Sequence, residues 1–184
     1  MILTIDVGNT NTVFGLFADG QLLESWRLKS EESRTIDESW VVFQQLAQTY
    51  NIDLQALRGV VIGSVVPKLT FVYRKMGTKY LKIEPLEVTG DLPLGIKLQV
   101  AAPREVGADR IANSYAGARL YGQPAIVIDF GTATTYDVVD EQGNFIGGAI
   151  APGIETSANY LLEKAALLHR IDFIVPEKAI GTDT

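Results

Sequence analysis

Two short segments of the sequence carry residues suited to binding a phosphate chain. DVGNT occupies positions 6–10 and DFGTATT positions 129–135, so each segment places an aspartate two residues before a glycine, followed by hydroxyl or amide side chains. A glycine lets backbone N–H groups approach an anion, and threonine and asparagine add donors. A carboxylate beside bound phosphates can hold Mg2+ or its water. The two segments therefore predict a nucleotide phosphate site with a hard cation.

Both segments belong to a longer internal repeat. TIDVGNTNTVFGLFADGQLL and VIDFGTATTYDVVDEQGNFI align without a gap at an offset of 123 residues. The matched residues are Asp6 with Asp129, Gly8 with Gly131, Thr12 with Thr135 and Gly20 with Gly143. One such segment alone is read more simply as a plain turn, and a duplication without chemistry is the alternative for the pair. The paired polar runs favour two phosphate loops that face each other.

The elements that must position these loops follow from the periodicity of the apolar residues. In each repeat a strand ends at the aspartate, turns and returns, and a third strand follows at 21–28 or 144–150, which predicts three antiparallel strands per half. Thr35 and Glu38 form a capping box that predicts a helix over 36–50. The other expected elements are strands at 59–66, 86–88, 124–130 and 171–175, helices at 68–80, 108–121 and 154–168, and a turn at 90–95.

Composition excludes several other classes of function. The chain has 184 residues, a formal charge of −6, no cysteine and one histidine, which argues against nucleic-acid binding, disulfides and thiolate or His-rich metal sites. We expect no secretory leader and no membrane span, because no stretch approaches the ~18 apolar residues that a span needs. Neither a Walker segment nor G-x-G-x-x-G occurs. We therefore expect a cytoplasmic protein with no nucleic-acid or membrane partner.

Five segments together resemble the type III pantothenate kinases, a family within the superfamily of acetate and sugar kinases, heat-shock ATPases and actin. They are DVGNT at 6–10, SVVP at 64–67, PREVGADR at 103–110, DFGTATT at 129–135 and GGAIAPG at 147–153. The resemblance implies an α/β fold of two duplicated actin-like (ribonuclease H-like) halves with mixed sheets. It places the first half and its phosphate loop at 1–100, and the second half with the other loop at 101–184. We expect that second half to be incomplete, because family members continue beyond this length.

The resemblance also implies a role for individual residues. The first ATP loop comprises Asp6, Val7, Gly8, Asn9, Thr10, Asn11, Thr12 and Val13, and Thr132 belongs to the second. The pantothenate contacts fall on Val100, Gly107, Ala108, Asp109, Arg110 and Thr184. Asp109 matches the proton acceptor of the family, and Asp129 matches its ligand for a monovalent cation, K+ or NH4+.

The implied reaction is transfer of the γ-phosphoryl group of Mg2+-ATP to the terminal hydroxyl of pantothenate, the first step of coenzyme A biosynthesis, by a homodimer. The chain departs from the family pattern at Val100 and Ala102, where members typically carry an aromatic residue and an asparagine. It also stops at Thr184. These departures support an alternative, a catalytically inactive nucleotide-binding or regulatory protein of the same fold.

Simpler interpretations apply to other candidate residues. His169 is expected at a helix end, where it complements the helix dipole rather than acting in catalysis. Ser64 lacks the nucleophile-elbow pattern and is expected to be structural. Trp26 and Trp40 are expected to pack in or beside the core. Arg110 could form an ordinary surface ion pair, but its position next to Asp109 favours a place in the site.

Overall fold

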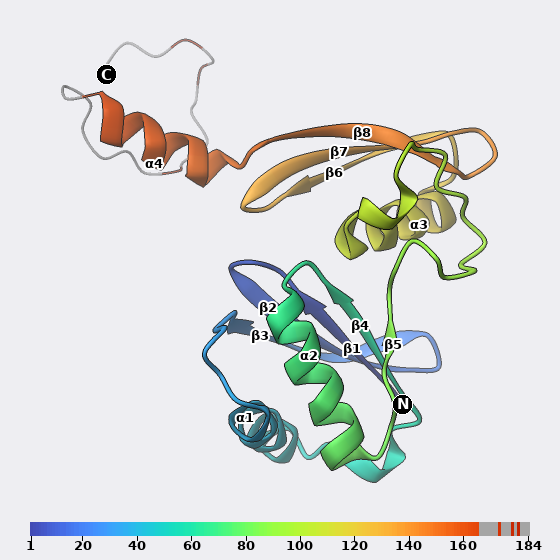
Figure 1. Ribbon diagram of the computed structural model, residues 1–184, viewed down its shortest axis with the longest axis vertical. Coiled ribbons are helices and arrows are strands. Elements are labelled where there is room, and N and C mark those ends of the chain that lie inside the picture. Colours follow the sequence, from blue (N-terminus) through green and yellow to red (C-terminus); the bar gives the residue numbers. More distant parts are fainter. Residues whose placement is uncertain (166–172, 174–177, 179, 181–184) are drawn as a thin grey trace.

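The computed structural model describes residues 1–165, 173, 178 and 180, and it consists of two sheet layers with one helix between them (Figure 1). The first sheet has the strand order β3-β2-β1-β4-β5. Its strands are β1 (Ile2–Val7), β2 (Asn11–Ala18), β3 (Gln21–Lys29), β4 (Gly59–Ser64) and β5 (Leu86–Glu87). Because β1 runs antiparallel to β2 and parallel to β4, this sheet is mixed, as the sequence predicts.

Two helices cover one face of the first sheet, and both begin where the sequence signals a start. In α1 (Ile36–Thr49) the Thr35 hydroxyl accepts a hydrogen bond from the Glu38 N–H at 3.2 Å, and the Glu38 carboxylate accepts one from the Thr35 N–H at 2.8 Å. This is the predicted capping box. In α2 (Pro67–Met76) the proline occupies the first turn, where its missing N–H costs nothing. The chain then continues through one π-helical turn, Gly77–Leu81.

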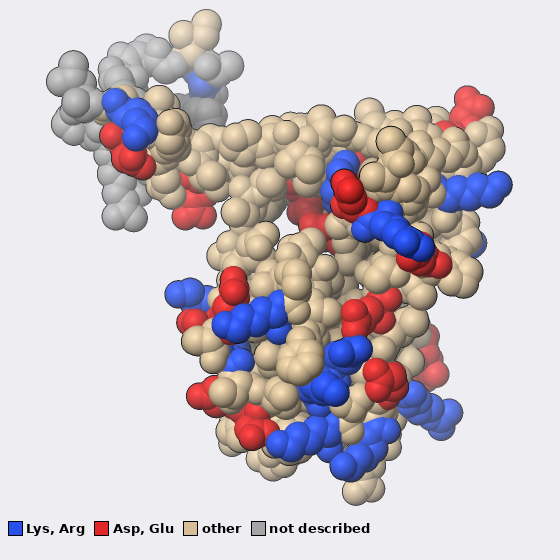
Figure 2. Space-filling view, in the orientation of Figure 1, with Lys and Arg blue, Asp and Glu red and all other residues tan. Residues whose placement is uncertain are grey.

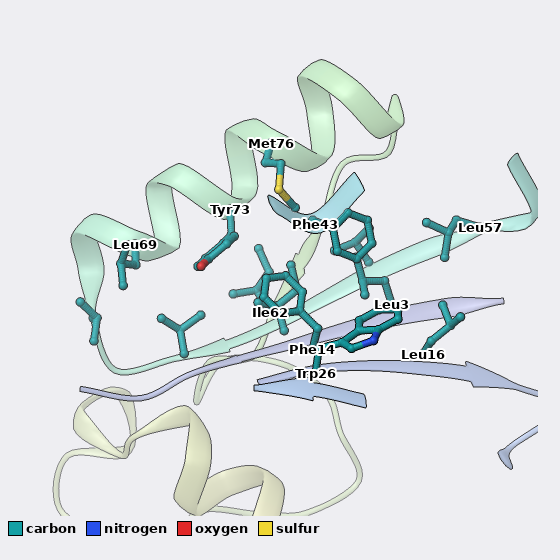
Figure 3. Packing of buried hydrophobic residues seen from close by; sticks show 14 residues of the cluster. Leu3, Phe14, Leu16, Trp26, Phe43, Leu57, Ile62, Leu69, Tyr73 and Met76 are labelled. Carbon is teal, nitrogen blue, oxygen red and sulfur yellow. The ribbon is translucent and has the colours of Figure 1, made fainter. Parts of the chain in front are cut away.

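The hydrophobic core lies between these helices and the sheet (Figure 3). Phe14 of β2 is at its centre, with its ring centroid 5.5 Å from that of Phe43 in α1 and 5.5 Å from that of Tyr73 in α2. Trp26 is buried beside Phe43, and Trp40 is partly buried. The predicted packing of both tryptophans is therefore confirmed.

The second sheet has the strand order β6-β7-β8, formed by Ala125–Phe130, Ala133–Val139 and Phe145–Pro152. These strands are antiparallel, and the only parallel element beside them among the described residues is a bridge from Leu98 to Phe145. The mixed character expected for this half is thus limited to that bridge. α4 (Ile154–Lys164) leaves the end of β8 (Figure 1). α4 ends at Lys164, with Ala165 in an extended conformation, so it is shorter than the helix expected over 154–168, and most of the strand expected at 171–175 lies outside the described residues.

α3 (Ala108–Tyr121) connects the two layers by packing against both sheets. Gly117 lies so close to Val127 of β6 that a β-carbon added there would be 2.5 Å from Val127 Cγ2. On the other side, a β-carbon on Gly63 of β4 would lie 3.8 Å from that of Ala108. Small residues at these contacts therefore let one helix bring the two halves close together.

The two hairpins are related, but their registers differ by one residue. In the first hairpin Asp6 is opposite Val13 and Val7 is opposite Thr12, whereas in the second Asp129 is opposite Thr135. The second loop is consequently one residue shorter. The gapless match of Thr12 with Thr135 is wrong in space, because Thr134 occupies the buried position equivalent to Thr12.

The two sheets differ strongly in how far their outer faces are covered. Leu3, Ile5 and Val7 are buried under α1 and α2, but the equivalent Ile126, Ile128 and Phe130 are 66%, 47% and 66% exposed. Within the described residues, α4 approaches this face only at one end, across a cavity of about 620 Å3. No helix in the described part of the chain is long and apolar enough to cross a bilayer.

Candidate active site

The two polar loops meet across a cleft between the sheets. The Thr10 and Thr132 hydroxyl oxygens are 2.8 Å apart, although 122 residues separate them in sequence. Both loops line a cavity of about 310 Å3. Its lining includes the predicted residues Asp6, Gly8, Asn9, Thr10, Asn11, Val13, Asp109, Asp129 and Thr132, together with Arg27, Val65, Phe130, Gly131, Ala133 and Thr135. The structure therefore brings most of the predicted nucleotide site to one place.

The first loop is held by Ser30, which directly follows β3 and which no sequence motif singles out. The Ser30 hydroxyl donates to the Gly8 carbonyl oxygen at 2.6 Å, and the Ser30 N–H donates to the Thr10 carbonyl oxygen at 2.9 Å. Thr12 is fully buried with its hydroxyl 2.9 Å from that of Ser30, and Val7 is buried in the core. Thr12 and Val7 therefore support the loop from behind, whereas their neighbours line the cleft.

The second loop is attached to the start of α4. The Gly153 N–H and the Thr156 hydroxyl both donate to the Thr132 carbonyl oxygen, at 3.0 and 2.9 Å. An adjoining cavity of about 490 Å3 lies over this helix start, lined by Glu155, Thr156 and Asn159 as well as by both loops. Because a helix N-terminus presents unpaired N–H groups, it adds positive potential beside the loops.

Three carboxylates share the floor of the cleft, where Figure 2 shows acidic residues in the hollow between the two layers. Desolvation raises the pKa of Asp6 above its ordinary value, and repulsion from Asp109 and Asp129 raises that pKa further, while Arg27 opposes the effect. Asp129 accepts a hydrogen bond from Asn113 Nδ2 of α3 at 3.0 Å. The three groups thus form a strongly negative region that a cation would stabilise.

Asp109 lies in the first turn of α3, beside two cavities at once. Its Oδ1 accepts the N–H of Arg110 at 2.8 Å, and Gly107, at the N-cap, supplies no side-chain cap. A second cavity of about 320 Å3, lined by Thr4, Ala112 and other small or apolar residues, meets the first one at the three aspartates. Asp109 can therefore contact groups that enter from either side.

Arg110 points away from these cavities and is held against the second sheet. Its Nε donates to Oδ1 of the fully buried Asp137 at 2.6 Å, and its guanidinium lies 5.3 Å from the centroid of Phe145. Burial raises the pKa of Asp137, and the bond from Arg110 opposes that rise. The Arg110 Nη2 is buried and has no hydrogen-bond partner among the described residues. Arg110 thus forms an ion pair, but one with a fully buried partner rather than an ordinary surface pair.

The other predicted substrate contacts are only partly placed. Val100 lies beside Gly147 of β8, next to the Gly148 position that packs on Arg110. Gly107 and Ala108 lie at the start of α3. Thr184 and His169 fall outside the described residues. Ser64 accepts hydrogen bonds from the Val66 N–H and the Thr70 hydroxyl, at 3.1 and 2.7 Å, so its predicted structural role is confirmed.

Sequence reasoning missed Ser30, Asn113, Asp137 and Arg27. A buried acid could have been suspected at Asp137, because it follows two threonines and a tyrosine in an otherwise apolar strand. The other three carry no local signal. Among the described residues, no three His, Cys, Asp or Glu side chains converge closely enough to hold a metal by themselves.

Two duplicated halves with facing polar loops and a carboxylate floor define the class of the protein as an actin-like ATPase fold. Solved structures agree on that fold. A crystal structure from Campylobacter jejuni, described as a Baf family transcriptional activator, is 19% identical, covers 96% of this chain and 68% of its own, and has a TM-score of 0.53. The activator of 2-hydroxyisocaproyl-CoA dehydratase from Clostridium difficile, with bound ADPNP, is 11% identical over 82% of this chain and 45% of its own, with a TM-score of 0.50.

The sequence comparisons narrow the class to one family. The family model for type III pantothenate kinase matches residues 2–184. A type III pantothenate kinase from Moorella thermoacetica is 47% identical over all 184 residues, and this chain spans 72% of that relative's length. The chain belongs to the type III pantothenate kinase family.

Proposed function

We propose that this protein transfers the γ-phosphoryl group of ATP to the terminal hydroxyl of pantothenate, forming 4′-phosphopantothenate in the first step of coenzyme A biosynthesis. Membership of the type III pantothenate kinase family supports the reaction and its substrates. The single structural observation that carries the proposal is the contact of the two loops at Thr10 and Thr132, at a cavity that the three aspartates also line.

The loops bind the triphosphate, and the carboxylates bind the cations that accompany it. Gly8 and Gly131 allow the backbone to approach phosphate oxygens, while Asn9, Thr10 and Thr132 supply side-chain donors. Oxygen donors at Asp6 and Asp129 suit Mg2+, which binds through one or two carboxylates together with substrate phosphates. Bound Mg2+ would neutralise charge that develops on the phosphoryl oxygens. Asp129, oriented by Asn113, is also the proposed ligand for K+ or NH4+.

Asp109 accepts the proton of the attacking hydroxyl. Asp109 lies between the phosphate cleft and the second cavity, so the hydroxyl that receives the phosphoryl group can approach it from one side and the nucleotide from the other. Phosphoryl transfer needs little covalent assistance, so positioning the hydroxyl and neutralising charge account for most of the rate.

The pantothenate site is proposed at the start of α3 and the adjoining part of β8. Gly107, Ala108 and Val100 belong to this region, and Arg110, whose guanidinium Asp137 holds in place, is a proposed further contact. Thr184 is a proposed further contact. We also propose a cytoplasmic homodimer with halves at 1–100 and 101–184, in keeping with the family resemblance.

A coupled assay for ADP release tests the proposal, with pantothenate present and absent and with the product identified by mass spectrometry. ADP release that requires pantothenate is expected. ATP binding without ADP release would favour the inactive nucleotide-binding alternative, for which the departures at Val100 and Ala102 argue. Failure to bind ATP would contradict both functions.

A further inference from the structure

One positively charged side chain, that of Arg27, lines the nucleotide cleft, and the mechanism proposed above does not use it. Val13 lies opposite Asp6 on one side and opposite Arg27 on the other, so the three residues form a row across β1, β2 and β3. Directly paired residues project from the same face of a sheet, and neighbouring strands are about 4.8 Å apart. Arg27 and Asp6 therefore flank the cleft floor with roughly 10 Å between their backbones.

Arg27 borders both parts of the nucleotide cleft. It lines the cavity of about 310 Å3 that contains the carboxylates and the cavity of about 490 Å3 at the start of α4. It is the only Lys or Arg among the described residues that line either one. Its side chain is exposed and forms no ion pair within the described part of the chain, unlike Arg110. The guanidinium is thus available to a ligand in the cleft.

A positively charged residue occurs at this position in only one of the two related hairpins. In the second hairpin the same row runs from Asp129 through Thr135 to Ile150, so an apolar residue occupies the position of Arg27. Structural duplication alone would not require this difference. A polyphosphate is strongly anionic and asymmetric. A metal ion at the carboxylates would neutralise it on one side only, so a positively charged arginine on the other side suits such a ligand.

We propose that Arg27 binds the phosphate chain of ATP from the side opposite Asp6, which extends the proposed function by a binding residue on β3. The triphosphate of ATP then lies between two groups: the carboxylates and the metal ion they would hold on one side, and the Arg27 guanidinium on the other. Arginine suits this position because its planar fork of N–H donors pairs with two phosphate oxygens at once. Charge-assisted bonds of this kind are about twice as strong as neutral ones.

Isothermal titration of this chain with ATP in the presence of Mg2+ tests the proposal. Arg27→Gln should weaken ATP binding at least about tenfold, equivalent to about 1.4 kcal/mol. Arg27→Lys should lose less, since it keeps the charge but not the fork. Arg58→Gln is the matched control. Arg58 is exposed just before β4, at the end of the strand far from the cleft, so its substitution removes the same charge at a distance from the site. Thermal unfolding should show similar melting temperatures for all three variants.

The outcomes separate this inference from the function on which it rests. Equal ATP affinity in folded Arg27→Gln and Arg58→Gln would overturn the role of Arg27 while leaving the kinase proposal intact. If Arg27→Gln does not fold, Arg27→Lys decides, and wild-type affinity in that variant would count against recognition by the guanidinium fork. Absence of ATP binding by the wild-type chain would overturn both proposals.

Discussion

Replacing Asp109 by asparagine separates catalysis from helix capping. The Asp109 Oδ1 accepts the Arg110 N–H at 2.8 Å, and an asparagine Oδ1 can accept the same bond. The variant loses a carboxylate at a helix N-terminus, worth about 0.3–1 kcal/mol. It also loses a like charge that raises the pKa values of Asp6 and Asp137, which is a compensating gain. We therefore expect the free energy of unfolding to change by less than about 1 kcal/mol.

The expected effect on turnover is much larger. A positioned general base contributes about 10²–10⁴ in rate, so Asp109→Asn should lower kcat at least about a hundredfold, equivalent to about 2.7 kcal/mol in the activation barrier. The assay measures kcat by coupled ADP release, ATP affinity by titration, and stability by denaturant unfolding. Asp19→Asn, in the exposed turn between β2 and β3 where asparagine tolerates the positive φ of 50°, is the control.

A folded Asp109→Asn variant with near wild-type turnover would refute the base assignment. Asp109 would then be a helix cap only, because asparagine serves that role almost as well. Loss of turnover accompanied by loss of folding would instead show that the stability estimate is wrong. Unchanged stability and ATP affinity with greatly reduced turnover is the result that the geometry predicts.

Three further perturbations test other parts of the site. Because the pKa of Asp6 is raised, the folded state keeps this proton to higher pH than the unfolded chain, and the carboxylate costs stability above the unfolded pKa of about 4. Asp6→Asn should therefore raise the melting temperature at pH 7, with a smaller gain near pH 4, while weakening Mg2+-dependent ATP binding; an unchanged melting temperature at pH 7 would contradict this. Gly153→Ala should lower both ATP affinity and stability, since its β-carbon would lie 2.6 Å from the Thr132 carbonyl oxygen, whereas Gly59→Ala meets only a flexible side-chain end at 3.1 Å and should be tolerated. Replacing K+ by Na+ should lower turnover, and Asp129→Ala should remove that dependence; equal rates of the wild-type protein in the two salts would exclude the cation assignment.

The sequence alone located the features that depend on near neighbours in the chain. The capping box at Thr35, a helix beginning beside Pro67 and the two polar hairpin loops were all predictable, because each depends on a few consecutive residues. The repeat also predicted that the loops face each other, which the contact of Thr10 with Thr132 confirms. Five matching motifs indicated the family correctly.

Only the tertiary structure decided the register of the second hairpin and the partners that complete the site. The one-residue difference in loop length is invisible in a gapless alignment, because strand pairing and burial set it rather than residue identity. Ser30, Arg27 and Asp137 act on residues that other strands or helices bring to them. A polar residue on a strand looks the same in sequence whether it meets solvent, a ligand or a buried charge. Sheet order and the packing of α3 between two sheets supply that difference, since they place groups more than a hundred residues apart within hydrogen-bonding distance.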